Sequence, residues 1–170
     1  MKYLLSFFAV LVFSFPVFAQ FVKDDRLLAP TFKVELLDGK IFSSPDLKGK
    51  IVVLNLWFVN CPRCVEEIKL LNKIVDDYGN NRDVVFIGLA INTRAELENF
   101  LEKNPFKYSI VPNAGDFMLF AFGERQKDGS YFLPFPTHVV IDRDGRIISK
   151  TSGVKGVEVV KSELARQFNK

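Results

Sequence analysis

The stretch WFVNCPRCVEEI, residues 57–68, contains both cysteines of the chain, Cys61 and Cys64, with two residues between them. It begins inside a nearly all-apolar run, IVVLNLWFV (51–59). Such a run predicts a strand buried on both faces of a sheet, and therefore a central strand. After Cys61, apolar residues recur at helical spacing as far as Tyr78. The sequence thus places both cysteines where a buried strand gives way to a helix.

The helix that follows is predicted over residues 62–78. Pro62 suits the first turn of a helix, where a backbone N–H would be unpaired in any case, and Gly79 suits its end. One side of the helix is apolar and is expected to pack against the sheet; its residues are Ile68, Leu70, Leu71, Ile74, Val75 and Tyr78.

The remaining segments alternate between strand and helix patterns, which predicts an α/β fold with a central mixed β-sheet flanked by helices. Two β-hairpins, one of them N-terminal, are expected to add antiparallel strands at the edge of that sheet. The predicted elements are a hairpin over 32–42, strands over 84–91 and 108–112, a helix capped by Thr93 and Glu96, a short helix near 116–122, a polar loop over 123–131, a hairpin over 137–149 and a helix over 157–168.

The first 19 residues have the pattern of a secretory signal peptide. Lys2 precedes an apolar run over 3–18, and Ala19 ends a cleavage pattern of small residues. An uncleaved membrane anchor is the alternative, which the shortness of the run and Pro16 disfavour. The sequence therefore predicts an exported protein with an extracytoplasmic, periplasmic location.

Cleavage would leave residues 20–29 as a flexible leader and residues 30–170 as a single domain. Removing the signal peptide takes away one Lys and no acid, which leaves 22 basic and 20 acidic residues. This balance is too even to predict binding to nucleic acid or to an anionic membrane surface. A single close pair of cysteines also cannot replace a core, so the domain must be held by its apolar interior.

The position of Cys61 predicts a reactive thiol. Unpaired backbone N–H groups and the positive end of the helix dipole stabilise an anion at a helix N-terminus. Because the thiolate is the reactive form, the pKa of Cys61 should be lowered and Cys61 should be the attacking thiol. Cys64, one turn further along, should be more covered and should resolve the mixed disulfide, while Arg63 adds a positive charge nearby.

Two other uses of the cysteine pair are disfavoured. A disulfide that closes a four-residue loop contributes only about 2 kcal/mol by loop-closure entropy, and the helix already holds its ends together. A zinc site needs four ligands, whereas the chain has two cysteines and one histidine, His138. We therefore expect neither a bound metal nor another cofactor.

Glu67 lies on the apolar side of the predicted helix, one turn after Cys64. A carboxylate there is costly unless it is used, and it could exchange the proton of the resolving thiol. The alternative is that an acid early in a helix simply suits the helix dipole. We prefer that alternative for Glu66, which shares its stripe with Lys73 and faces water.

Pro136, in PFPTHVV (134–140), precedes a predicted strand. From its position alone it is either an ordinary residue at the start of a strand or a cis-proline in a tight turn.

Taken together, these motifs resemble the extracytoplasmic thioredoxin-like proteins of the TlpA/ResA type. APTFKVELLDGKIFSSPDLKGKIVVLNLWFVNCPRC (29–64) is similar to their A-P-x-F start, D-G-K hairpin, L-K-G-K segment, N-x-W and CxxC, and PFPTHVVIDRDGRI (134–147) to their cis-proline turn and hairpin. The resemblance spans residues 29–153. It implies a thioredoxin fold with a cis peptide bond before Pro136.

The resemblance also implies roles for individual residues. Asn55 falls where cytoplasmic thioredoxins have a buried acid, Glu67 where the disulfide reductases of this group have theirs, and Trp57 on the tryptophan before the active-site loop. Two features depart from the family pattern. Proline comes first in the Pro62-Arg63 dipeptide, as in less reducing proteins, and Phe135 is bulky and would narrow the substrate groove. His138 is expected to be a structural strand residue.

The leading hypothesis is a thiol–disulfide oxidoreductase that reduces disulfides of exported proteins. The resemblance implies a membrane thiol-relay partner as electron donor and cytochrome c maturation as one setting. A disulfide oxidase or isomerase would use the same cysteines, although the chain is too short for a separate dimerisation domain, and we expect a monomer.

Two further alternatives are weaker. A copper-binding thioredoxin-like chaperone would suit two thiolates and an imidazole, but its relatives have three residues between the cysteines. A peroxiredoxin would need Pro and Thr or Ser where this chain has Leu54 and Phe58.

Overall fold

A five-stranded mixed sheet forms the centre of the computed structural model, in the order β5–β4–β3–β8–β9. The strands β3, β4 and β5 are parallel, and β8 and β9 run antiparallel to their neighbours. Their bounds are Ile51–Trp57 for β3, Val84–Ala90 for β4, Ser109–Val111 for β5, Thr137–Ile141 for β8 and Ile147–Ser152 for β9.

The structure describes residues 27–79, 81–153 and 155–169. The predicted signal peptide and residues 20–26 of the predicted leader lie outside the described residues. Residues 27–29 are held by the domain, because Ala29 N–H donates to the carbonyl of Gly145 at 2.8 Å and Ile147 N–H donates to that of Leu27 at 2.9 Å. This part of the expected flexible leader is therefore fixed to the turn between β8 and β9.

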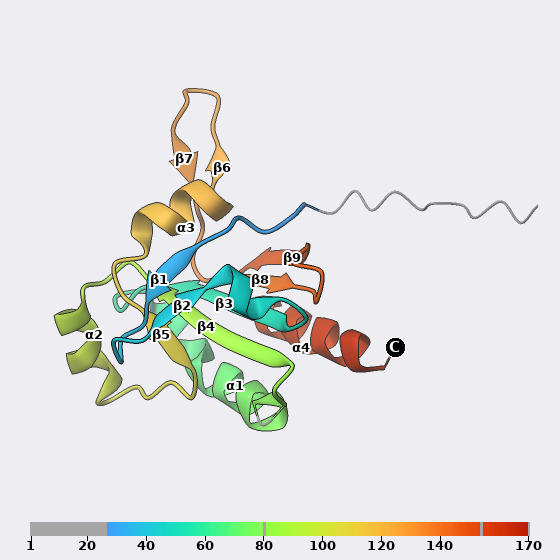
Figure 1. The fold of residues 1–170 in the computed structure, drawn as a ribbon. Coiled ribbons are helices and arrows are strands. Elements are labelled where there is room, and N and C mark those ends of the chain that lie inside the picture. Colours follow the sequence, from blue (N-terminus) through green and yellow to red (C-terminus); the bar gives the residue numbers. More distant parts are fainter. Residues whose placement is uncertain (1–26, 80, 154, 170) are drawn as a thin grey trace, which may run out of the picture.

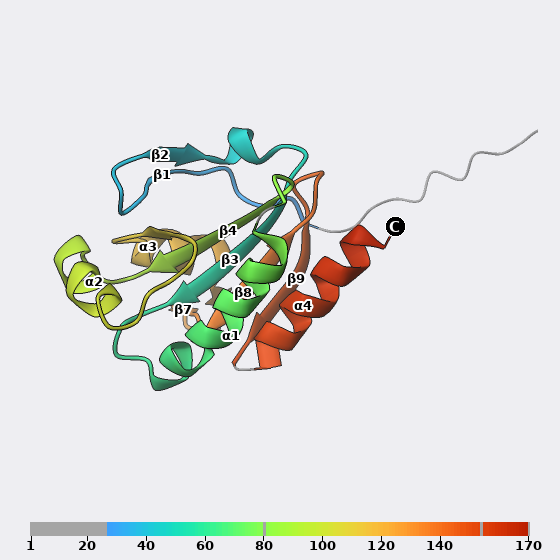
Figure 2. The same ribbon diagram turned by 90° about the horizontal axis from the view of Figure 1, so that it is seen from below.

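The helices cover the sheet in two layers. Helices α1 (Pro62–Tyr78) and α4 (Lys155–Phe168) lie side by side on one face, and α3 (Gly115–Phe122) lies on the other (Figures 1 and 2). Helix α2 (Arg94–Leu101) packs Leu97 beside Trp57 at the end of the sheet. None of these described helices combines the length and apolar character needed to cross a membrane.

The strand β3 is central because every one of its residues is buried. Successive side chains of a strand point to opposite faces. Accordingly, Ile51 and Val53 pack with residues of α1 and α4, while Leu54 and Leu56 pack with residues of α3. The prediction of a strand buried on both faces is confirmed.

The N-terminal hairpin exists, but its expected place at the edge of the main sheet is wrong. Its strands β1 (Lys33–Glu35) and β2 (Ile41–Ser43) form a separate two-stranded sheet, followed by a 3₁₀ helix over Ser44–Leu47. The hairpin docks through its turn, where Leu37 N–H donates to the carbonyl of Ile110 at 2.7 Å and Arg94 donates to the carbonyl of Leu37.

The second hairpin adds its two antiparallel strands to the side of β3, as expected. The strand β8 pairs with β3 inside the sheet, and only β9 occupies the edge. All five residues of β8 are buried, which suits an inner position, whereas two of the six residues of β9 are exposed. The prediction that this hairpin adds antiparallel strands at the edge of the sheet is confirmed, with β9 outermost.

The predicted polar loop over 123–131 is in part a small hairpin that projects from the domain (Figure 1). Its strands β6 (Glu124–Arg125) and β7 (Tyr131–Phe132) pair antiparallel. The turn is closed locally, since Gln126 N–H donates to the carbonyl of Ser130 at 2.7 Å and Gly129 adopts a φ of 86°. These contacts depend on turn geometry, which the polar composition did not reveal.

Two adjacent leucines of α1 provide a matched test of the packing. Leu71 is 1% exposed, whereas Leu70 is 46% exposed, contrary to its assignment to the apolar side. We predict that Leu71→Ala lowers the free energy of unfolding by about 2–5 kcal/mol, because it leaves a cavity under the helix. Leu70→Ala should change it by less than about 0.5 kcal/mol. Urea unfolding of both variants checks this, and equal losses would contradict the packing described.

Candidate active site

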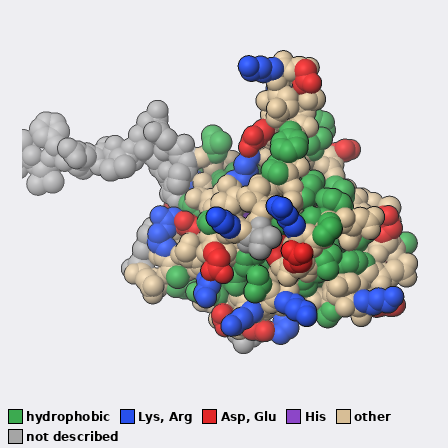
Figure 3. Space-filling view, turned by 180° about the vertical axis from the view of Figure 1, so that it is seen from behind, with side chains coloured by type: hydrophobic (Ala, Val, Ile, Leu, Met, Phe, Trp, Pro, Cys, Tyr) green, Lys and Arg blue, Asp and Glu red, His purple; other side chains and the backbone are tan. Residues whose placement is uncertain are grey.

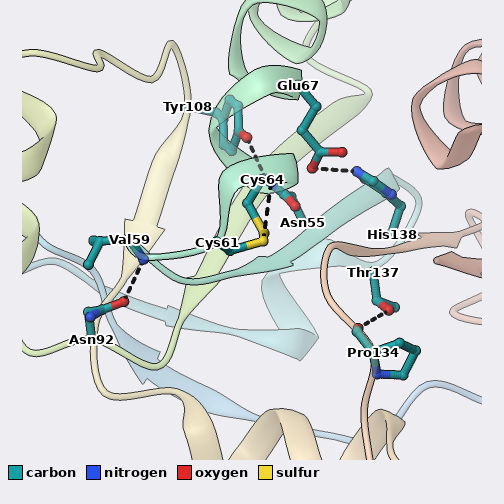
Figure 4. The surroundings of a disulfide bond; sticks show 10 residues. All are labelled: Asn55, Val59, Cys61, Cys64, Glu67, Asn92, Tyr108, Pro134, Thr137 and His138. Atoms are coloured by element: carbon teal, nitrogen blue, oxygen red, sulfur yellow. Dashed lines mark hydrogen bonds and ion pairs between the residues drawn. A yellow bond between two sulfur atoms is a disulfide. The ribbon is translucent and has the colours of Figure 1, made fainter. Parts of the chain in front are cut away.

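The two cysteines form a disulfide at the start of α1, with Cα atoms 5.2 Å apart (Figure 4). Cys61 is the N-cap of the helix, and its Sγ accepts a hydrogen bond from the N–H of Cys64 at 3.2 Å. Cys61 is 5% exposed and Cys64 is 1% exposed. The expected order of exposure is confirmed, and the sulfur of Cys61 lies where helix N–H groups are unpaired.

The loop between β3 and α1 is hydrogen-bonded to the segment that follows β4. Val59 N–H donates to Oδ1 of Asn92 at 2.9 Å, and Cys61 N–H donates to the carbonyl of Phe58 at 3.2 Å. Asn92 follows β4, which is parallel to β3, so both loops leave the sheet at the same edge. The sequence interpretation missed Asn92; its position just after a predicted parallel strand was the available signal.

The Pro136 segment lies against this loop. The Phe135–Pro136 peptide bond is cis, the isomer that the family resemblance implied. The Phe135 ring meets that of Phe58 edge-on, with centroids 5.3 Å apart. Thr137 fixes the segment by donating its hydroxyl hydrogen to the carbonyl of Pro134 at 2.6 Å. The bulky Phe135 therefore packs on the active-site loop itself.

Glu67 is fully buried, whereas the adjacent Glu66 is exposed, as predicted for the two acids. Oε1 of Glu67 lies 3.0 Å from Nε2 of His138, which is also fully buried (Figure 4). His138 lies in a strand, as expected, but the interpretation of it as merely structural missed this contact. Burial raises the pKa of the Glu67 carboxyl above its ordinary value, and the hydrogen bond with His138 opposes that rise.

A second buried polar pair lies behind the disulfide. Nδ2 of Asn55 donates to the hydroxyl of Tyr108 at 2.9 Å. Burial raises the pKa of Tyr108, so this phenol stays protonated. Gly88 leaves room for the Tyr108 ring and the Trp57 indole, since a Cβ there would press on both. Tyr108 was not among the predicted site residues.

The other predicted site residues fall into two groups. Trp57 is fully buried and stacks on Phe106 with ring centroids 4.6 Å apart, so it belongs to the core beneath the disulfide. Pro62 and Arg63 are exposed at the first turn of α1. Across the described ranges, no three His, Cys, Asp or Glu side chains cluster as a metal site would require.

The AhpC/TSA family model matches residues 27–150, which include both cysteines and the Pro136 segment. The chain belongs to the AhpC/TSA family. It is 31% identical over 140 residues to the thiol-disulfide oxidoreductase ResA of Bacillus cereus, covering 81% of this chain and 75% of that protein. The ResA of Geobacillus thermodenitrificans is 28% identical over 139 residues, covering 80% and 74%.

Solved structures place this AhpC/TSA member in the thioredoxin fold. A thiol:disulfide interchange protein from Chlorobium tepidum superposes with a TM-score of 0.71 at 24% identity, covering 85% of this chain and 97% of that one. StoA from Bacillus subtilis gives 0.60 at 20% identity, covering 79% and 96%. With a disulfide-forming Cys61–Cys64 pair at the start of α1, the protein is a thiol–disulfide oxidoreductase of the ResA type.

The buried carboxyl predicts a particular dependence of stability on pH. A raised pKa of Glu67 in the folded state means that folding favours the protonated form, so wild-type stability falls as pH rises from about 4.3 through that pKa. Glu67→Gln cannot ionise and should escape this loss.

We therefore expect the stability of Glu67→Gln relative to wild type to increase between about pH 4 and pH 8. Glu66→Gln, at the exposed neighbouring position, should show no such trend. Urea unfolding of the oxidised proteins across this range measures both differences. A pH-independent difference for Glu67→Gln would contradict the proposed burial cost.

Proposed function

We propose that this oxidoreductase works outside the cytoplasm as a reductase of protein disulfides. The observation that carries the proposal is the placement of Cys61 at the N-cap of α1 with the buried Glu67 one turn beyond Cys64. Disulfide exchange needs an activated attacking thiol, here Cys61, and an acid near the resolving thiol, here Glu67 near Cys64.

The reaction balances with the residues at the site. The Cys61 thiolate attacks a substrate disulfide and forms a mixed disulfide, and one substrate thiolate leaves. The Cys64 thiol gives its proton to Glu67 and attacks the sulfur of Cys61, which releases the second substrate thiolate. The substrate thiolates take up protons, and the enzyme is left with the Cys61–Cys64 disulfide.

The family resemblance supplies the partners of this proposal. The substrates are exported proteins with accessible disulfides, apocytochrome c among them, and a membrane thiol-relay protein returns the cysteine pair to the dithiol. The predicted signal peptide over 1–19 supports this location. Acidic and basic side chains are interspersed on the face shown in Figure 3, which fits a protein that does not bind nucleic acid.

The same cysteines would also serve a disulfide oxidase or isomerase, and one observation favours that second function. Proline comes first between the cysteines, at Pro62, as in proteins of higher potential. The copper-chaperone alternative is less favoured, because Nε2 of His138 faces Glu67 in the interior. Leu54 and Phe58 continue to disfavour a peroxiredoxin.

The reduction potential of the Cys61–Cys64 pair decides between reductase and oxidase. A reductase should equilibrate near the value of thioredoxin, about −270 mV, and an oxidase near that of DsbA, about −120 mV. Equilibration with glutathione or dithiothreitol buffers, followed by alkylation and mass measurement, gives the potential. A value near −120 mV would refute the reductase proposal.

The roles of the two cysteines predict different trapped species. Cys64→Ser should accumulate a mixed disulfide between Cys61 and a substrate protein, because the resolving thiol is missing. Cys61→Ser, the matched control, should trap far less, since Cys64 is almost fully covered. Non-reducing gels of both variants after incubation with an oxidised protein substrate measure this. Equal trapping would contradict the assignment of Cys61 as the attacking thiol.

A further inference from the structure

The imidazole of His138 is placed to act on Glu67. His138 lies in β8, two residues after the cis-proline Pro136, and it shares a face of the strand with Val140, which packs with residues of α1 and α4. Figure 4 shows the Glu67 carboxyl group turned toward the His138 ring. Both side chains are 0% exposed, so this contact forms in the protein interior.

We propose that His138 is a positioning residue for proton transfer at the cysteine pair: it holds Oε1 of the Glu67 carboxylate and leaves Oε2 to exchange the proton of Cys64. The inference rests on the proposed role of Glu67 in disulfide reduction.

The two carboxylate oxygens of Glu67 differ in their hydrogen bonding. An ionised carboxylate only accepts hydrogen bonds, so Nε2–H of His138 is the donor to Oε1 at 3.0 Å. Oε2 of Glu67 is buried and has no hydrogen-bond partner among the described residues. An unpaired carboxylate oxygen in the interior is costly unless something binds it. The proton released by Cys64, one helical turn away, is the species that this oxygen can accept.

His138 is fixed by the pairing of its backbone in the sheet and by the close approach of α4 to its ring. Its backbone lies between Asn55 of β3 and Thr151 of β9 in the sheet. Gly156 of α4 lies against the ring, and a Cβ at this position would overlap Nδ1. A glycine in the first turn of α4 is therefore what lets the imidazole fit between the sheet and the helix.

Among the described residues, His138 is the neighbour that lowers the pKa of Glu67 against the effect of burial. Just before β5, Tyr108 is affected by the charge of Glu67 but stays protonated. On α1 the neighbouring titratable groups are Cys61 and Cys64, while Asn55, Thr151 and Gly156 contribute no charge. The bond from His138 is therefore the main interaction opposing the effect of burial on the Glu67 pKa. Without it, less Glu67 would be ionised near neutral pH, and the transfer of the Cys64 proton would slow.

The test is the pH profile of disulfide reduction by the full-length protein, with insulin disulfides as the probe. His138→Leu should move the acid limb, where Glu67 must be ionised, to higher pH by about one unit. His138→Gln keeps an N–H donor at the position of Nε2, so its acid limb should lie close to the wild-type pH. Val140→Ala, on the same face of the same strand, removes core packing without touching Glu67 and should leave the limb in place.

The variant Glu67→Gln distinguishes the role of Glu67 in proton transfer from the role of His138 in holding Glu67. Glu67→Gln should abolish the limb, and adding His138→Leu to it should produce no further shift, since His138 acts through Glu67. A limb retained in Glu67→Gln would refute the role of Glu67. A limb lost in Glu67→Gln but unmoved in His138→Leu would refute the inference for His138 alone, and so would an equal shift in Val140→Ala.

A measurement that does not depend on activity covers the case in which His138→Leu fails to fold. The carboxyl carbon of Glu67 can be titrated by carbon-13 NMR in the oxidised protein and in His138→Asn, whose shorter amide cannot reach Oε1. The pKa of Glu67 should be higher in His138→Asn than in wild type and close to wild type in His138→Gln. The same pKa in all three proteins would overturn the inference.

Discussion

The burial of β3 on both faces is the constraint on which the active site depends. Because every residue of this strand is covered, helices must pack on each side of the sheet, and the chain can emerge only at its ends. At the carboxyl end it passes directly into α1, so that Cys61 becomes the N-cap. The reactivity expected of this thiol follows from the same geometry, since the cap position exposes its sulfur to unpaired N–H groups.

The interior that fixes the cysteines also contains polar groups that an apolar core would not need. Oε1 of Glu67 lies 3.0 Å from Nε2 of His138, and Asn55 and Tyr108 form a second pair beside the disulfide. Burial raises the pKa of Glu67 and so costs stability when the carboxyl ionises. A fold retains such a group at a cost when it serves the chemistry, and the role we propose for it is the movement of a proton at Cys64.

Two features of the site favour opposite directions of electron flow. The family resemblance associates the buried acid Glu67 with disulfide reduction, whereas the proline directly after Cys61 is found in more oxidising couples. In our proposal His138 is a third influence, because it holds the carboxylate that exchanges the proton of Cys64. On that proposal the direction of exchange depends on the whole cluster and not on the CPRC motif alone.

Much of this protein could be predicted from local sequence. The apolar run over 51–59, the stripe of α1 and the capping residues Thr93 and Glu96 specify their elements, because burial and capping repeat with the period of the backbone. The same periodicity placed Glu67 inside and Glu66 outside. Strand order could not be read in this way, so the separate position of the N-terminal hairpin was missed.

Long-range neighbours were decided only by the tertiary structure. Glu67 and His138 are 71 residues apart, and Val59 and Asn92 are 33 apart. These contacts depend on which strands lie next to each other and on the space that Gly156 leaves. Neither can be read from the local sequence. The sequence by itself determined where the two thiols stand and which acid is buried beside them. The tertiary structure decided what holds that acid, because only the packed sheet brings His138 of β8 to the helix that carries Glu67.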